Sequence, residues 1–487
     1  MDGLVQLGSA LIIITALLLS NRTENFSSEI ASIGSVAKND IPADSGLPLF
    51  LNFYPRFGPD FRLFDLIQKL KLNNSSPMWN GIYKKGSGSR SLLESKKLPP
   101  VILVPGLGAS PLFARWNKSS TDTVQTVDAS GDFQQPDAWS CKQVQDTWVQ
   151  IWPPDSDGLN SYCWANNTRV VVDGLKVVNA TGVNTINQEF GSLKFANEDY
   201  MSTLVDALEA VGYVKGENLF AACYDFRKIG DPQEIDAWCM SLTKLIEQNC
   251  ALQENPAIVV GHDLGAVVAN YFLVGAMQEW KDKFIDKFVS VSGSFGGCPK
   301  ALRAVLSGVS GSENFNTAVQ TSSGLSLMLP NPMLYGDNPL IQFNQLSYTS
   351  RDIPKLVESV SEDAAKVLKL SKMVRDTSMK APGVEVHILA GTDLNTESSY
   401  SYGMSLTDEP GKNAPFYKLD LPYNQKFNYN DQFTGDGTMP KFALEYPIFW
   451  SKYQSQPVYF QFFTGCEHTK ILSTLEPIQY ILNACSD

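Results

Sequence analysis

Histidine is scarce in this chain, with three residues among 487. Basic side chains are also outnumbered, because 39 Lys and Arg face 51 Asp and Glu and leave a net charge of −12. So acidic a chain lacks the positive surface that binds phosphates, which excludes nucleic acid as a partner. The 8 cysteines are too few for a disulfide-built miniprotein, and no Cys-x-x-Cys pair or spaced Cys/His set occurs. We therefore expect neither a metal ion nor a cofactor.

Long apolar runs are missing too, except at the N-terminus, where residues 11–19 are almost entirely aliphatic. This run is shorter than the roughly 20 residues of a membrane span and is typical of a signal-peptide core. We predict that residues 1–20 are a signal peptide. An N-terminal anchor is the alternative, because no basic residue precedes Arg22. A secreted or luminal glycoprotein is also indicated by Asn-x-Ser/Thr triplets, which begin at Asn21, Asn25, Asn73, Asn74, Asn117, Asn166 and Asn179.

The rest of the composition supports a large folded core, since 43% of the residues are hydrophobic and 18% are charged. Residues 21–97 carry clusters of Ser, Asn, Gly and Pro, which favours an irregular N-terminal extension. After them, strand-like apolar runs alternate with helical periodicity. This alternation predicts an α/β fold with a mostly parallel sheet and helices on both faces. The predicted strands are 100–106, 218–225, 257–261, 284–292, 384–390 and 457–463, and the helices are 201–211, 236–249, 266–278 and 471–482.

Two long stretches, 110–197 and 297–382, interrupt the alternation. In α/β sheets, excursions of this length usually fold over the carboxyl ends of the strands, where ligands bind. We therefore expect them to cover the site.

The most informative segment, residues 258–266, has the pattern strand, Gly-His-Asp-Leu-Gly, helix. This is the setting of the nucleophile elbow of α/β-hydrolases, in which glycines flank a residue on a strained turn. Asp263 occupies the position that ordinarily carries a nucleophilic serine. A Gly-x-x-x-Gly pattern alone is weak evidence, but its strand–helix setting and its downstream partners strengthen the interpretation.

The partners of Asp263 follow in the order nucleophile, acid, base. Asp436 lies in a turn-rich Gly-Asp-Gly-Thr loop, and His468 follows the last predicted strand. The two other histidines, His262 and His387, are interpreted as core residues with satisfied ring nitrogens. We expect the His262 side chain to point away from the site.

Backbone N–H groups for an oxyanion hole are predicted at two positions. Leu107 lies in a Gly-Leu-Gly loop after the first strand, and Leu264 opens the helix behind the elbow. A phosphate loop at Gly106 and Gly108 is rejected, because no Gly-Lys-Ser/Thr follows.

A series of short motifs runs along residues 98–487. They are Val101–Gly108, Ile151-Trp152, Cys163–Val170, Gly212-Tyr213, Tyr224–Arg227, Gly296-Gly297, Pro382–Val386 and Gly435–Thr438. No single motif is unique, but their number and order are specific. Together they resemble the lecithin–cholesterol acyltransferase and lysosomal phospholipase A family.

The resemblance implies an α/β-hydrolase domain over 98–487, with a membrane-binding loop region at 138–168 and a cap or lid at 297–382. The family uses a Ser–Asp–His triad to move an acyl chain from a glycerophospholipid to an alcohol or water. The implied partners are a glycerophospholipid or other lipid and the surface of a membrane or lipoprotein, bound peripherally. A secreted or lysosome-like location is also implied.

Within the implied loop region, Trp148, Ile151 and Trp152 are expected to contact membrane or lipid. Residues 153–162 are more polar than the family's apolar loop, which should weaken insertion. Trp139 and Trp148 could equally be core aromatics.

By the same resemblance, Cys141 and Cys163 match the family's loop disulfide. The partners of the remaining cysteines stay open from sequence. Cys466 and Cys485 could pair with each other or with Cys223, Cys239, Cys250 or Cys298.

In terms of the triad, Asp436 carries over as the acid and His468 as the base, but the nucleophile position holds Asp263. A carboxylate that attacks an ester would have to form a mixed anhydride, and its charge would compete with the developing oxyanion. His468 between two aspartates should stay protonated and be a poor base.

Three functions remain open. The first is a lecithin–cholesterol acyltransferase-like acyltransferase or phospholipase with impaired activity. The second is a catalytically inactive pseudoenzyme that binds lipid. The third is an Asp-nucleophile hydrolase, because Gly-His-Asp-x-Gly resembles the elbow of haloalkane dehalogenases and epoxide hydrolases.

Overall fold

The computed structural model describes residues 97–116, 148–154, 162–180, 182–187, 191–197, 199–309, 312–343, 346–402 and 434–486. The predicted signal peptide, almost all of the predicted N-terminal extension, Trp139 and Cys141 lie outside the described residues.

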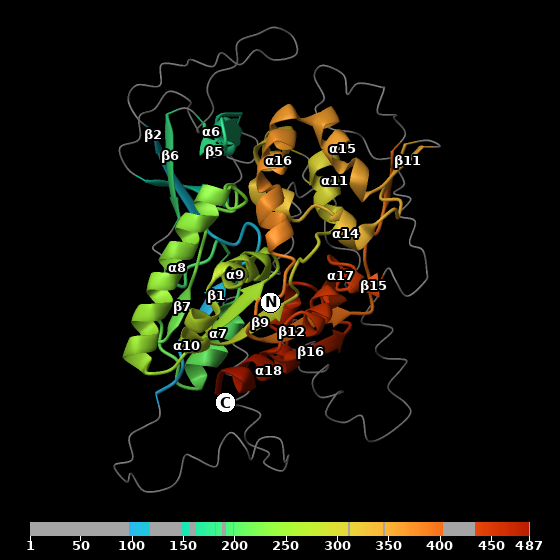
Figure 1. The fold of residues 1–487 in the computed structure, drawn as a ribbon. Coiled ribbons are helices and arrows are strands. Elements are labelled where there is room, and N and C mark those ends of the chain that lie inside the picture. Colours follow the sequence, from blue (N-terminus) through green and yellow to red (C-terminus); the bar gives the residue numbers. More distant parts are fainter. Residues whose placement is uncertain are drawn as a thin grey trace, which may run out of the picture. The chain divides into compact units, whose positions relative to one another are not determined.

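The centre of the fold is a six-stranded sheet in the order β16-β12-β9-β8-β1-β7 (Figure 1). Every neighbouring pair in it is parallel. Parallel sheets need both faces covered, which explains why these strands read as nearly continuous apolar runs. All six predicted strands are confirmed: β1 Val101–Val104, β7 Leu219–Ala221, β8 Ala257–His262, β9 Ile285–Val291, β12 Glu385–Thr392 and β16 Val458–Thr464.

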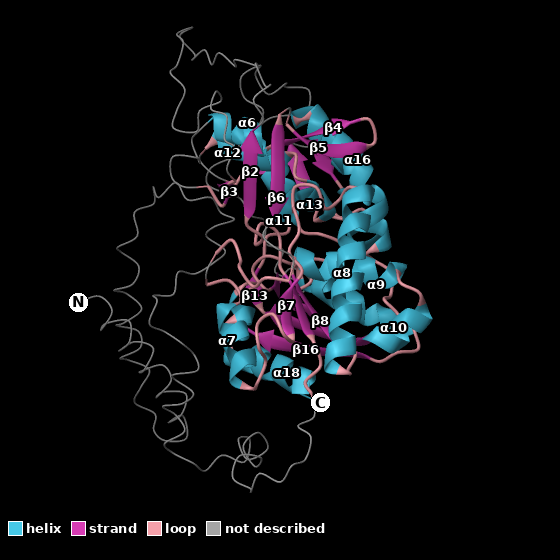
Figure 2. Ribbon diagram, turned by 90° about the vertical axis from the view of Figure 1, so that its left-hand side faces the viewer, coloured by secondary structure: helices cyan, strands magenta, loops and turns pink. Residues whose placement is uncertain are grey.

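Helices cover both faces of the sheet (Figure 2), as predicted for an α/β-hydrolase fold. Alternate residues of β1 point to opposite faces: Val101 and Leu103 pack with α7 and α18, whereas Ile102 and Val104 pack with α8 and α9. The bounds of these helices and of the short α10 are α7 Ser202–Ala210, α8 Pro232–Gln253, α9 Leu264–Gly275, α10 Gln278–Phe284 and α18 Leu475–Ser486.

Helix α8 begins one turn earlier than predicted, because Asp231 caps it. The Asp231 carboxylate accepts a hydrogen bond from the Gln233 N–H, and Pro232 occupies the first turn. The last helix is displaced in the other direction: a 3₁₀ turn, η5 Lys470–Leu472, precedes α18.

Of the first long excursion, the structure describes a three-stranded antiparallel sheet in the order β3-β2-β6, a short helix and a hairpin. Their bounds are β2 Leu112–Trp116, β3 Val149–Trp152, α6 Tyr162–Thr168, β4 Val170–Asp173, β5 Lys176–Asn179 and β6 Val183–Asn187.

The second excursion is mainly helical, and Figure 1 shows it beyond the end of the central sheet. Its elements are α11 Pro299–Ser307, α12 Glu313–Gln320, α13 Ser323–Leu327, α14 Pro332–Tyr335, β10 Ile341–Phe343, β11 Leu346–Tyr348, η2 Ser350–Asp352, α15 Ile353–Val360 and α16 Glu362–Thr377. The chain after β12 adds β13 Leu394–Asn395, β14 Tyr400–Tyr402, β15 Thr434–Gly435, α17 Lys441–Glu445 and η4 Tyr446–Lys452.

Across the described ranges, no helix is both long enough and apolar enough to cross a membrane.

Candidate active site

Asp263 lies on a sharp turn between β8 and α9, with φ 53° and ψ −124°. Few residues with a side chain adopt a positive φ, and such strain is typical of functional turns. The flanking glycines are required by space. A Cβ on Gly261 would lie 2.6 Å from the Ala266 Cα, and one on Gly265 would lie 2.2 Å from the Val104 carbonyl oxygen. The segment therefore has the geometry of a nucleophile elbow.

The predicted acid and base lie together at the carboxyl ends of the strands. The Asp436 Oδ2 is 2.7 Å from the Nδ1 of His468. The other oxygen of Asp436 accepts hydrogen bonds from the N–H groups of Thr438 and Met439, at 3.0 and 2.8 Å. With Asp436 fully buried, this arrangement fixes the orientation of the imidazole.

On the opposite side of the ring, the Nε2 of His468 is 3.5 Å from the Oδ1 of Asp263. The Oδ1 atom is buried and makes no hydrogen bond, so this contact is an ion pair without hydrogen-bond geometry. The second oxygen of Asp263, Oδ2, accepts a hydrogen bond from the Leu107 N–H at 3.0 Å. The carboxylate thus occupies a donor that was expected to serve an oxyanion.

Charge is distributed unevenly among these groups. Burial opposes the charged form of His468, but the carboxylates of Asp436 and Asp263 outweigh it and raise the pKa of the imidazole to about 10. Burial also opposes ionisation of Asp263. The neighbouring His468 prevails, together with the Leu264 N–H, and lowers the pKa of that carboxyl. At neutral pH the site therefore holds an aspartate–imidazolium–aspartate array.

The expectation that His262 points away from the site is wrong. Its ring lies 5.1 Å from the ring of His468, and its Nε2 is 3.1 Å from the His468 carbonyl oxygen. The Nδ1 atom is 2.9 Å from the Tyr200 hydroxyl. Burial, followed by the charge of His468, lowers the pKa of His262 to about 4, so this ring is neutral. The prediction of a satisfied core histidine is confirmed for His262, and also for His387, which contacts Glu385 and Tyr480.

Direct membrane contact by Ile151 and Trp152 is also contradicted, because both side chains are buried. The Trp152 indole N–H donates to the Gly108 carbonyl oxygen at 2.6 Å, and its ring packs against Phe226 at 4.9 Å. Trp152 therefore supports the loop at residues 106–108, which the sequence predicts to supply an oxyanion N–H. Trp148 is 37% exposed and stacks with the Arg115 guanidinium, 4.7 Å from the ring centroid.

Four cysteines whose partners the sequence left open are buried free thiols: Cys250, Cys298, Cys466 and Cys485. Disulfides among these four are therefore excluded. Cys163 is buried in α6 and is disulfide-bonded. Its predicted partner Cys141 lies outside the described residues, so the identity of the partner stays a prediction.

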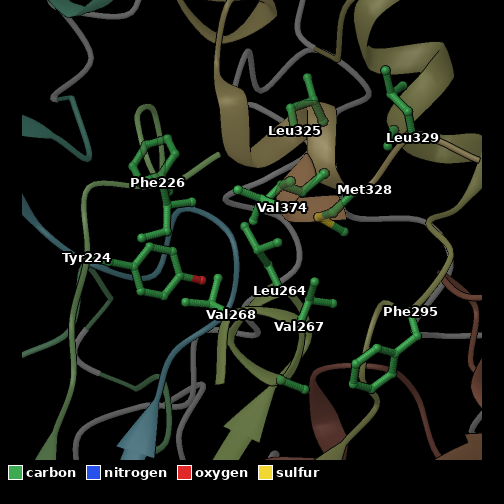
Figure 3. Packing of buried hydrophobic residues seen from close by; sticks show 14 of the residues in the cluster. Tyr224, Phe226, Leu264, Val267, Val268, Phe295, Leu325, Met328, Leu329 and Val374 are labelled. Atoms are coloured by element: carbon green, nitrogen blue, oxygen red, sulfur yellow. The ribbon is translucent and has the colours of Figure 1, made fainter. Parts of the chain in front are cut away.

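A cavity of about 130 Å³ opens onto Asp263 and His468. Figure 3 shows part of its apolar surroundings, where Leu264 on α9 faces residues of the second excursion. The apolar lining residues are Leu107, Ala301, Val309, Leu325 and Met328, and the polar ones include Lys300, Arg303, Glu397 and Thr438.

Sequence reasoning missed the charged residues of this cavity. The Lys300 ammonium donates to the Gly437 carbonyl oxygen at 2.6 Å, and the Arg303 guanidinium lies 3.4 Å from the Glu397 carboxylate. The sequence signal was the spacing of Lys300 and Arg303, one turn apart on α11. Amphipathic surface helices show the same spacing, so it did not indicate a cavity. Tyr200 was missed as well; its hydroxyl accepts a hydrogen bond from the Gly106 N–H at 2.8 Å.

Comparison with known proteins agrees with this geometry. The family model described as "Lecithin:cholesterol acyltransferase" matches residues 146–330. The phosphatidylcholine-sterol acyltransferases of Papio anubis and Homo sapiens are 28% and 29% identical to this chain, in each case over 87% of it and 94% of the relative. The human "Lysosomal phospholipase A and acyltransferase" is 27% identical over 80% of this chain and 91% of its own length. In its motifs, its fold and the relatives that it matches, the chain is similar to the lecithin–cholesterol acyltransferase and lysosomal phospholipase A family.

Proposed function

We propose that this protein binds an acyl lipid in the cavity beside Asp263 and transfers or hydrolyses its acyl chain very slowly. The observation that carries the proposal is the hydrogen bond from the Leu107 N–H to the Asp263 carboxylate. An oxyanion hole stabilises negative charge that develops on the substrate during attack. Here a permanent negative charge already uses that donor.

The base is impaired for a related reason. A general base must be neutral before it can accept a proton. His468 lies between two carboxylates that hold its pKa at about 10, so the imidazolium predominates at neutral pH. The occupied Leu107 N–H and the protonated His468 both involve the Asp263 carboxylate, so both defects remain while that carboxylate is present.

Lipid binding is supported by the cavity itself and by the names of the relatives. Apolar side chains from the second excursion, such as Leu325 and Met328, meet the polar site at its end. This combination suits a ligand with an apolar chain and a polar ester. A catalytically inactive lipid-binding pseudoenzyme is the limiting case of the same proposal.

Further features of the proposal concern location. We place the protein in the secretory pathway, with residues 1–20 as the targeting segment and the excursion at 297–382 as the cap. Peripheral contact with a membrane or lipoprotein is assigned to Trp148, whose exposed ring and neighbouring Arg115 suit a lipid–water interface.

The test compares native protein with Asp263→Ser and Asp263→Ala in single-turnover acyl release from phosphatidylcholine vesicles. Asp263→Ser restores a nucleophile and frees the Leu107 N–H, so its rate should exceed the native rate by at least about 100-fold, the typical effect of one oxyanion-hole donor. Asp263→Ala frees the hole without supplying a nucleophile and should stay slow. Equal and substantial rates in native protein and Asp263→Ser would overturn the proposal.

A further inference from the structure

A chain of buried hydrogen bonds lies beside the elbow. The Gly106 N–H donates to the Tyr200 hydroxyl at 2.8 Å, and that hydroxyl is 2.9 Å from the Nδ1 of His262. The Nε2 of His262 is 3.1 Å from the carbonyl oxygen of His468. The side chains of Tyr200, His262 and His468 are all buried. The chain therefore joins the loop that carries Leu107 to the main chain of the predicted base.

The chemistry of the partners allows only one direction for these hydrogen bonds. A carbonyl oxygen can only accept, so the Nε2 of His262 carries the proton that it donates to His468. Burial, followed by the charge of His468, lowers the pKa of His262 to about 4. The ring is therefore neutral, and its Nδ1 is an acceptor. It follows that the Tyr200 hydroxyl donates to Nδ1 and accepts from the Gly106 N–H. Each donor in the chain meets an acceptor, as a buried network requires.

We propose that Tyr200 and His262 are positioning residues for the acyl reaction. They hold two groups at the elbow, the predicted oxyanion donor Leu107 and the predicted base His468. Both groups contact Asp263, one at each carboxylate oxygen. The inference rests on the proposed function, because the positions of an oxyanion donor and a base matter only if an acyl ester reacts. It goes beyond that function by giving a role to two residues outside the predicted triad positions.

At the loop end of the chain, the main chain approaches the elbow too closely for a side chain to fit. A Cβ on Gly106 would lie 2.9 Å from the Asp263 Oδ2 and 3.3 Å from the His262 Nδ1. Glycine is therefore required here, and the loop is held through its main chain. The next N–H along the chain is that of Leu107, which meets Asp263 at 3.0 Å. Loss of the Tyr200 hydroxyl would leave the buried Gly106 N–H without that acceptor, so the loop should shift.

At the other end, the main chain of His468 is held on both sides. Its N–H donates to the Asp436 carbonyl oxygen at 2.9 Å, and its own carbonyl oxygen accepts from His262. Loss of the His262 donor would free the carbonyl side, and the His468 Nε2 would then shift relative to Asp263, which lies 3.5 Å away. A displacement of about 1 Å at a reacting group can cost about 100-fold in rate.

The first test separates the two ends of the chain in the full-length protein. In His262→Asn the amide oxygen can replace Nδ1 as the acceptor for Tyr200, whereas in His262→Gln the amide nitrogen can replace Nε2 as the donor to His468. Hydrogen–deuterium exchange is followed in the peptide that covers Gly106 and Leu107 and in the peptide that covers His468. His262→Gln should speed exchange in the first peptide and His262→Asn in the second, each by about fivefold, the effect of one lost hydrogen bond.

The second test asks whether these positions matter for the acyl reaction. In protein that carries Asp263→Ser, Tyr200→Phe should slow single-turnover acyl release from phosphatidylcholine vesicles by at least about fivefold. The vesicle concentration that gives half the maximal rate should not change. Tyr480→Phe is the matched control, because the Tyr480 hydroxyl also lies 2.9 Å from a histidine Nδ1, that of His387. This control should leave the rate unchanged.

Native exchange of the Leu107 peptide in both Tyr200→Phe and His262→Gln would overturn the proposal. So would equal losses of rate in Tyr200→Phe and Tyr480→Phe. Faster exchange throughout the central sheet, β9 included, would also overturn it, because that result indicates a role in stability alone. If Asp263→Ser releases no acyl chain, the proposed function fails, and the exchange results then decide the positioning role by themselves.

Discussion

The charge of Asp263 should be visible in the titration of His468. Asp263→Asn keeps the shape of the side chain but removes its negative charge. The two groups are 3.5 Å apart and almost fully buried, with side chains that are 4% and 9% exposed. At this distance two unit charges interact by about 5 kcal/mol at an effective dielectric constant of 20, and by about 1 kcal/mol in bulk water. Since one pH unit corresponds to about 1.4 kcal/mol, the pKa of His468 should fall by about 1 to 3 pH units.

The assay is NMR titration of protein labelled with ¹⁵N in histidine only, which is practical because the chain has three histidines. His387 serves as an internal reference, because its partners are Glu385 and Tyr480 rather than the elbow. Asp436→Asn should lower the pKa of His468 further, since Asp436 is closer to the ring, at 2.7 Å. An unchanged His468 pKa in Asp263→Asn would refute the electrostatic account of the site.

The same interaction makes stability depend on pH. The pKa of His468 is raised from 6.5 to about 10 in the folded protein, so the folded state binds this proton more tightly than the unfolded state does. The resulting stabilisation is complete below pH 6.5 and is lost as the pH rises toward 10. Urea denaturation across this window should show a steeper loss for native protein than for Asp263→Asn. Parallel profiles would contradict the prediction.

Three stability predictions concern the framework of the site. Arg227→Met should lower the free energy of unfolding by about 3–5 kcal/mol, because it leaves the buried Asp225 carboxylate without its ion-pair partner. A loss of less than about 1 kcal/mol in urea denaturation, which is the value of an exposed ion pair, would contradict this prediction. Gly265→Ala should cost at least about 1–3 kcal/mol, since its Cβ would lie 2.2 Å from a β1 carbonyl oxygen. Gly275→Ala in the same helix, where nothing lies within 4 Å, is the matched control and should be neutral or stabilising. Trp152→Phe should cost about 1 kcal/mol through the lost indole hydrogen bond, and an unchanged melting temperature would show that bond to be dispensable.

Local patterns explain why the sheet could be predicted. A buried parallel strand such as β8 is a short apolar run with glycine near its end, and a helix such as α9 follows at once. The elbow could also be predicted, because Gly261 and Gly265 leave no room for a Cβ beside the elbow segment itself and the neighbouring strand. Helix ends were less predictable, since caps such as Asp231 depend on a single side chain.

The sheet, the elbow and the chain order of Asp263, Asp436 and His468 could be predicted from residues alone, because they follow from local periodicity and from loops at strand ends. The hydrogen bond from the Leu107 N–H to one oxygen of Asp263 could not be predicted in this way, since it joins residues 156 apart. The burial of Trp152 against the loop at residues 106–108 was equally hidden from the sequence. Such contacts depend on how distant segments pack. The sequence alone does not show whether an apolar or charged side chain faces lipid, solvent or a cavity.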